Sequence, residues 1–235
     1  MTFGRRVLPI SCRSYSWCLL CCALMTAAAD AKEPSECPAV PAVVSQASAS
    51  EFAIACEAAR VAAQFLQAAG AQVPSRIQID VVAAMPPGVP ADAPGCYSVR
   101  TRRVFLLQWV VFERRRTWLG VAADLALYRS VATHEVAHAI ARCQKPARSL
   151  SRLAHEYLAN VTMYATMEPA LRERMLAAHP GTGYEHERQI NILDYLFDPA
   201  LFGADAYRHW TQQVDRAGFL RRVLEGKVIV EMERD

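Results

Sequence analysis

Residues 124–143 read DLALYRSVATHEVAHAIARC, and the interpretation of the whole chain depends on this stretch. Apolar and small residues dominate it, and their spacing predicts a helix over its full length. Near its centre, His134 and Glu135 are followed by two apolar residues and then by His138. Four residues turn a helix by about 400°, so the two imidazoles lie on one face, one turn apart, and can share one metal ion.

The motif has the composition of a catalytic zinc site. Zinc binds neutral imidazole nitrogen, and a catalytic site uses three protein ligands together with a water molecule. Glu135 projects beside the face that carries the histidines, where its carboxylate can take a proton from that water. We therefore predict that His134 and His138 are Zn²⁺ ligands and that Glu135 is the general base. The neighbouring residues are uncharged, as a buried helix requires: Val131, Ala132, Thr133, Val136, Ala137, Ala139 and Ile140.

The third ligand is expected on a second predicted helix, residues 153–167, where His155 and Glu156 are both candidates. The first motif and the run Glu156-Tyr157-Leu158-Ala159 together resemble the gluzincins, which are zincin metallopeptidases with a glutamate ligand and include thermolysin. In that group a glutamate in a Glu-x-x-Ala or Glu-x-x-Ser helix motif completes the site. The resemblance covers roughly residues 96–165. It implies Glu156 as the third ligand, with His155 as the alternative.

The resemblance implies three further features. Thermolysin-like enzymes have an acidic residue one turn after the ligand, which supports a zinc histidine. Asn160 takes that place here and would keep the hydrogen bonding without the charge. An edge strand that binds extended substrates is expected upstream of the motif helix, at residues 103–107. An oxyanion-stabilising residue is expected from the C-terminal part, with four candidates: Tyr184, His186, Tyr207 and His209.

The order of predicted elements indicates an α+β fold. The predicted strands are residues 77–83 and two strands within 96–112, with a turn near Thr101 and Arg102. The other predicted helices are residues 51–69, 169–178, about 185–197 and about 204–224. We therefore expect one zincin-like domain over residues 51–235. It would contain a small mixed sheet, the motif helix and a helical C-terminal subdomain from about residue 184.

Residues 1–31 have the pattern of a secretory signal peptide. Basic residues precede the uncharged apolar run Trp17–Ala29, and small residues at positions 29 and 31 offer a cleavage site. The run is too short to span a bilayer comfortably, so we expect export to the periplasm or medium, without stable membrane insertion after cleavage. An uncleaved anchor is the alternative. Residues 32–50, which are rich in Pro, Ala and Ser, are expected to form a tether.

The chain has 8 cysteines in 235 residues. Half of them belong to the predicted signal peptide: Cys12, Cys18, Cys21 and Cys22. The remaining cysteines can pair in three ways in an oxidising compartment. The simplest arrangement joins Cys37 to Cys56 and Cys96 to Cys143. The alternative is that some of these cysteines are buried thiols or metal ligands. No spacing typical of a cysteine zinc site is present.

Charge and composition exclude several function classes. The net charge of +3, without a long basic run, gives no electrostatic basis for binding nucleic acid. A hydrophobic content of 53% excludes a disordered chain. The expected function is zinc-dependent hydrolysis of a peptide or protein substrate. The alternative is an exported binding or assembly protein that uses a zincin scaffold without catalysis, since fold does not fix function.

Overall fold

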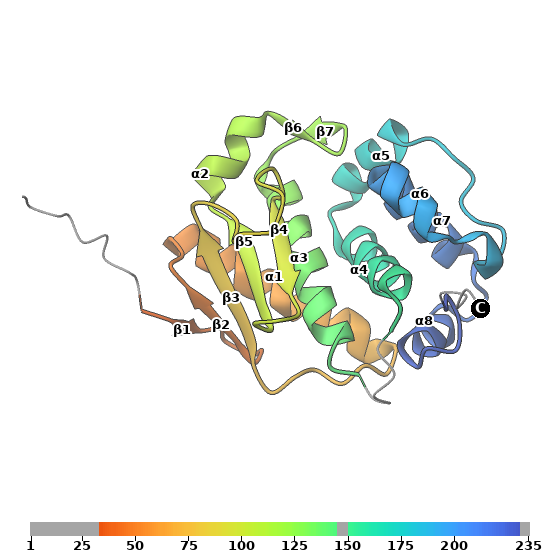
Figure 1. Ribbon diagram of the computed structural model, residues 1–235, viewed down its shortest axis with the longest axis horizontal. Helices are drawn as coiled ribbons and strands as arrows, with labels where there is room; N and C mark the ends of the chain where they lie inside the picture. The colour runs from red at the N-terminus through yellow and green to blue at the C-terminus, as the bar shows by residue number, and fades with distance from the viewer. Residues whose placement is uncertain (1–32, 145–149, 231–235) are drawn as a thin grey trace, which may run out of the picture. The chain divides into compact units, whose positions relative to one another are not determined.

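The computed structural model describes residues 33–144 and 150–230 (Figure 1). The predicted signal peptide, residues 1–31, lies outside the described residues. The strands are β1 (Ser35–Glu36), β2 (Ala42–Ser45), β3 (Ile77–Val82), β4 (Gly95–Ser98), β5 (Arg103–Leu107), β6 (Thr117–Trp118) and β7 (Val121–Ala122). The helices are α1 (Ala49–Ala68), α2 (Trp109–Phe112), α3 (Leu125–Ala141), α4 (Arg152–Thr166), α5 (Pro169–Ala178), α6 (Ile192–Phe197), α7 (Pro199–Gln212) and α8 (Arg216–Leu224), with short 3₁₀ helices η1 (Glu113–Arg115) and η2 (Glu187–Gln189).

The main sheet is mixed, and the α+β class predicted from the sequence is confirmed. Its strand order is β1-β2-β3-β5-β4, in which β2, β3 and β5 are parallel and the outer strands β1 and β4 run antiparallel to their neighbours. Parallel strands need a crossover connection, and α1 supplies it between β2 and β3. Helix α3 packs against α1 and α4 and also against β4 and β5 (Figure 1). The motif helix is therefore at the centre of the fold.

A capping box fixes the start of α1 and links it to α2. The Ser48 hydroxyl accepts a hydrogen bond from the backbone N–H of Glu51, and the Glu51 carboxylate accepts one from the N–H of Ser48 at 2.8 Å. The other oxygen of Glu51 accepts a hydrogen bond from the N–H of Trp109 at 2.7 Å. One buried carboxylate therefore anchors the first turns of two helices.

The edge strand differs from the one expected. Residues 103–107 form β5, which lies between β3 and β4 and so has no free edge. The strand at this edge is β4, which pairs antiparallel with β5, Gly95 opposite Leu106 and Ser98 opposite Arg103. The hairpin turn near Thr101 and Arg102 is confirmed, and it folds β4 back along the outside of β5.

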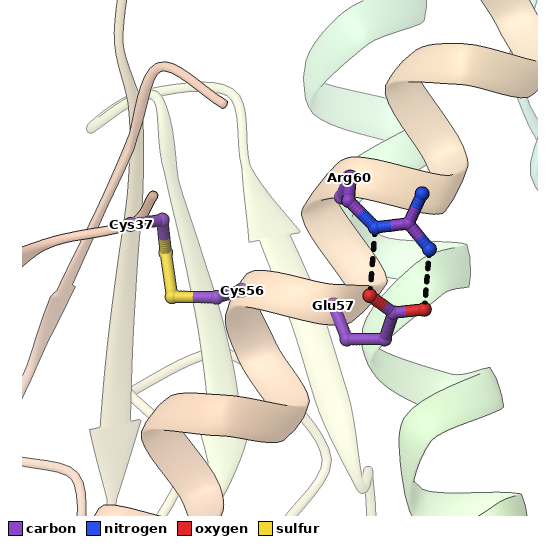
Figure 2. The surroundings of a disulfide bond; sticks show 4 residues. All are labelled: Cys37, Cys56, Glu57 and Arg60. Carbon is purple, nitrogen blue, oxygen red and sulfur yellow. Dashed lines mark hydrogen bonds and ion pairs between the residues drawn. A yellow bond between two sulfur atoms is a disulfide. The ribbon is translucent and has the colours of Figure 1, made fainter. Parts of the chain in front are cut away.

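The predicted tether, residues 32–50, contains part of the sheet. Strand β2 pairs with β3 along its whole length, Ala42 opposite Ile77. The expected disulfide Cys37–Cys56 is confirmed, and it joins the segment before β2 to α1 (Figure 2). One turn later on α1, Arg60 donates two hydrogen bonds to the Glu57 carboxylate, at 2.8 and 2.6 Å (Figure 2).

The expected second disulfide, Cys96–Cys143, is wrong, because both cysteines are free. Tyr97 is opposite the fully buried Val104 and therefore points to the sheet face that packs against the helices. Adjacent strand residues point to opposite faces, so Cys96 points away from that side. Cys143 lies just beyond the end of α3, on the helical side of the sheet.

Two other boundaries differ from the predicted ones. The second strand of the pair ends at Leu107, and the apolar residues 109–112 form a helical turn, α2, instead of continuing it. The helix predicted over about 204–224 is two helices, α7 and α8. The helical C-terminal part belongs to the same core as the sheet, since Phe202 and Phe219 pack in one buried cluster with sheet residues. Among the residues described, no helix is long and apolar enough to cross a membrane.

Candidate metal centre

Helix α3 places the two histidines of the motif side by side. The helix begins after Asp124, whose carboxylate accepts a hydrogen bond from the N–H of Leu127 at 2.8 Å. Buried residues occur all round it, as expected for a helix covered on every side. The Nε2 atoms of His134 and His138 lie 3.1 Å apart.

Helix α4 brings Glu156 to the same point. Its Oε2 lies 3.7 Å from Nε2 of His134 and 3.7 Å from Nε2 of His138. Ligands bonded to a tetrahedral zinc ion at about 2.0–2.2 Å are separated by about 3.3–3.6 Å, so the three atoms are spaced close to what one ion requires. The structure thus brings together the three residues predicted as metal ligands, and they form a group that could hold a metal ion.

His155, the alternative third ligand, lies nearby but outside this group. Its ring centroid is 6.1 Å from that of His138, whereas the group with converging ligand atoms contains Glu156. Burial lowers the pKa of His155 to about 4, with a further contribution from His138. The geometry favours Glu156 over His155.

The electrostatics of the group suit a cation. Burial lowers the pKa of His134 well below its usual value and that of His138 to about 4, so both imidazoles are neutral at pH 7 and do not form ion pairs with Glu156. Neutral imidazole is the form that binds a metal. Burial raises the pKa of Glu156 to about 7, against hydrogen bonding from Tyr195 and the charge of Arg152. A buried carboxylate between two neutral imidazoles is a donor set that fits a divalent ion.

Glu135 lies between α3 and the edge strand. Its side chain is buried against Gly95 of β4: a Cβ atom built on Gly95 would lie 2.8 Å from Cγ of Glu135. Burial raises the pKa of Glu135 to about 8, the Glu156 charge raises it further, and a hydrogen bond from the backbone of Tyr97 opposes the shift. The predicted general base is therefore next to the ligand group and in contact with the edge strand.

The expected role of Asn160 is not found. Its amide group donates to the backbone carbonyl of Glu156 at 2.9 Å, and its Oδ1 faces Gly203, where a Cβ atom would clash with it. Nδ1 of His134 is buried and has no hydrogen-bond partner among the described residues. Asn160 is a helix residue bonded to the carbonyl four positions earlier, so its amide is turned toward its own helix.

Residues 42–233 match the model of a family of unknown function, DUF6639. The chain belongs to this family. Comparison with curated proteins and with solved structures gave no match. The matched residues of this DUF6639 chain include the whole candidate centre, from β4 to the helices that follow α4.

The centre of this DUF6639 protein opens into a cleft of about 620 Å³. Residues of strand β4 and the loop before it, of α3 and the N-terminal part of α4, and Tyr195 of α6 line this cleft. The residues of the ligand group and Glu135 all line this cleft. A substrate in the cleft would therefore contact the candidate ligands and the edge strand at the same time.

Sequence reasoning did not find Tyr195. It hydrogen-bonds to Glu156, and burial raises its pKa to about 12. None of the four predicted oxyanion candidates lines the cleft. Tyr184 donates to Asp194 at 3.3 Å, and His209 is fully buried against the hydroxyl of Tyr157 at 2.7 Å. No sequence motif identifies Tyr195, because its position in the cleft depends on how α6 packs in the folded chain.

Proposed function

We propose that this protein is a zinc-dependent metallopeptidase of the gluzincin type. The observation that carries the proposal is the convergence of ligand atoms from His134, His138 and Glu156, at separations of 3.1 to 3.7 Å, on two helices packed together. The mixed sheet supports it further, because its antiparallel edge strand lies against Glu135. A cleft bounded by an edge strand and a metal-binding helix suits an extended peptide.

The chain's own groups have distinct roles in the proposed reaction. His134, His138 and Glu156 would hold the ion. Bound zinc supplies polarisation of the scissile carbonyl and lowers the pKa of the attacking water. Glu135 takes the proton of that water and delivers it to the nitrogen of the departing amine. Tyr195 donates its hydroxyl hydrogen to Glu156 and keeps that carboxylate oriented.

Strand β4 can bind the peptide backbone. The backbone carbonyls of Pro94 and Ser98, at the two ends of β4, accept hydrogen bonds from the N–H groups of Leu107 and Arg102. These two carbonyls therefore point toward β5. In an antiparallel ladder alternate residues point the other way, which leaves Gly95 and Tyr97 facing the free edge. An extended peptide can add there by main-chain hydrogen bonds to Gly95 and to the carbonyl of Tyr97, whose N–H group donates to Glu135.

The proposal is tested by Glu135→Gln in the full-length protein loaded with zinc. We expect the variant to bind one zinc ion per chain, measured by elemental analysis, because Glu135 is not a ligand. Hydrolysis of a peptide mixture, followed by mass spectrometry, should fall by about 10²- to 10⁴-fold, the usual contribution of a general base. Glu156→Gln should lose zinc as well as activity.

Glu173→Gln is the matched control, since Glu173 is exposed on α5 and lies outside the cleft. It should retain both zinc and activity. Undiminished hydrolysis by Glu135→Gln would overturn the assignment of the base. Stoichiometric zinc with no hydrolysis of any peptide would instead favour the alternative, a binding protein on the same scaffold.

A further inference from the structure

Two arginines line the same cleft as the candidate ligands. Arg142 comes one turn after His138, at the end of α3, and Arg152 comes one turn before Glu156, at the start of α4. A helix rises 1.5 Å per residue, so each arginine starts about 6 Å along the helix axis from its ligand. Arg142 also acts electrostatically on His155 in the first turn of α4, the helix that begins at Arg152.

Neither arginine is in an ion pair among the described residues. The arginines that do form ion pairs with carboxylates are Arg60, Arg103, Arg129, Arg174 and Arg208. Arg152 lies over the ring of Tyr195, with its guanidinium carbon 5.3 Å from the ring centroid, and donates a hydrogen bond to the Tyr195 hydroxyl, which leaves its other N–H groups for a ligand. A cation at a helix N-terminus is disfavoured by the helix dipole, so the position of Arg152 is not explained by the stability of α4.

The charges of the cleft leave these arginines uncompensated once an ion is bound. The charged side chains that line it are Glu135, Glu156, Arg142 and Arg152. A divalent ion beside the two glutamates balances their charge. Two guanidinium charges then remain among the residues that line the cleft.

We propose that Arg142 and Arg152 bind a carboxylate of the substrate, so that the cleft selects acidic peptides. This proposal rests on the peptidase function proposed above and names its substrate class. Guanidinium groups bind carboxylates through paired, charge-assisted hydrogen bonds, which gives both affinity and orientation.

The geometry also indicates which residue of the bound peptide should carry the carboxylate. An extended chain rises about 3.3 Å per residue, so a distance of about 6 Å corresponds to two residues from the scissile bond. Strand β4 runs from Gly95, beside Glu135, to Tyr97, whose hydroxyl is influenced by Arg142. A peptide that pairs antiparallel with β4, the more stable mode, has its N-terminal side at the arginines. We therefore expect an acidic side chain about two residues before the scissile bond.

The test compares matched synthetic peptides with zinc-loaded full-length protein. One pair carries Glu or Gln two residues before the scissile bond, and a second pair ends in a free carboxylate or an amide. We expect the Glu peptide to be cleaved with a kcat/KM about three- to tenfold higher than the Gln peptide, the range for two exposed ion pairs. A preference seen only for the free C-terminus would mean that the chain end supplies the carboxylate, bound parallel to β4.

Variants identify the residues responsible. Arg142→Gln and Arg152→Gln together should bring the ratio of kcat/KM for the Glu peptide to that for the Gln peptide close to one, whatever the rate at which the Gln peptide is cleaved. Arg114→Gln is the matched control, since Arg114 is exposed on η1 and does not line the cleft. The proposal is overturned if the wild-type protein cleaves both members of each peptide pair with the same kcat/KM. It is also overturned if the double variant keeps the wild-type preference for the carboxylate-bearing peptide.

Binding separates this proposal from the peptidase function. Fluorescence anisotropy with labelled Glu and Gln peptides measures affinity without turnover, and the preference for Glu should weaken as salt rises, because exposed charges are screened. If no peptide is cleaved but the Glu peptide binds tighter and loses this advantage in the double variant, the peptidase function fails and the carboxylate subsite stands. If peptides are cleaved with no acidic preference, only the subsite fails.

Discussion

Gly95 is the residue that allows Glu135 to lie against the edge strand. A methyl group at this position would sit 2.8 Å from Cγ of Glu135 and 3.3 Å from its Oε1. The same methyl would lie 3.2 Å from the backbone oxygen of Phe105, so it has little room to move. The absence of a side chain at residue 95 therefore sets the position of the proposed base.

Gly95→Ala should lower peptide hydrolysis by about 10²-fold, because a displacement of about 1 Å in a catalytic group has an effect of that size. Zinc content should stay at the wild-type level. The three heavy atoms nearest to a Cβ on Gly95 belong to Glu135 and Phe105, and none belongs to a proposed metal ligand. Ser98→Ala in the same strand is the control and should keep its activity. Equal kcat/KM for Gly95→Ala and the wild type would contradict the proposed position of Glu135.

Tyr195 and Asn160 show how far single residues can be predicted here. The i, i+4 spacing of the histidines is a local property, and it correctly anticipated that their nitrogens meet. The place of Tyr195 beside Glu156 is set by the packing of a later helix, and no spacing along the chain encodes it. Asn160 has the motif position expected of a residue that supports a zinc histidine, but its side-chain amide donates to the backbone carbonyl of Glu156 in its own helix.

At the level of elements, the disulfide Cys37–Cys56 ties the N-terminal segment to α1. The two cysteines are separated by 19 residues, and both are buried. A cross-link that closes a loop of this size restricts the unfolded chain and stabilises the fold by about 3 kcal/mol.

Replacing Cys37 and Cys56 together by Ala should therefore lower the free energy of unfolding by about 3 kcal/mol, measured by urea denaturation under non-reducing conditions. Cys143→Ala is the control, because Cys143 is free and exposed, and it should change stability by less than about 0.5 kcal/mol. A double variant as stable as the wild type would mean that the cross-link does not constrain the unfolded chain.

The helices and strands also differ in how well the sequence pattern predicted them. Helix α3 has buried residues on every side, and its length and composition were sufficient to predict it. Residues 109–112 are as apolar and aromatic as a strand, yet they form a helical turn, because the N–H of Trp109 bonds to Glu51 of α1 instead of continuing the ladder. That hydrogen bond joins residues far apart in the sequence.

Over the whole molecule, the proposed metal would connect the two central helices. His134 and His138 belong to α3 and Glu156 to α4, so an ion bound to all three links these helices only in the folded state. A ligand that binds the folded chain alone stabilises it by about 2.7 kcal/mol at a concentration of 100 times its Kd.

Zinc should therefore raise the Tm by about 5–10 °C in differential scanning calorimetry, and a chelator should reverse the shift. Glu156→Gln should remove most of the shift, because the third ligand is lost. Glu173→Gln should preserve it. A Tm that does not respond to zinc in the wild-type protein would contradict a metal site at this position.

The sequence by itself determined the features that depend on neighbouring residues. These are the motif helix, the one-turn spacing of its two histidines and the α+β class of the fold. Periodicity is enough for such features, because a helix or strand places residues by its own geometry. The tertiary structure alone decided which strand lies at the edge, how Gly95 admits Glu135, and that Tyr195 reaches Glu156. Each of these depends on packing between segments distant in the chain, and no local pattern carries that information.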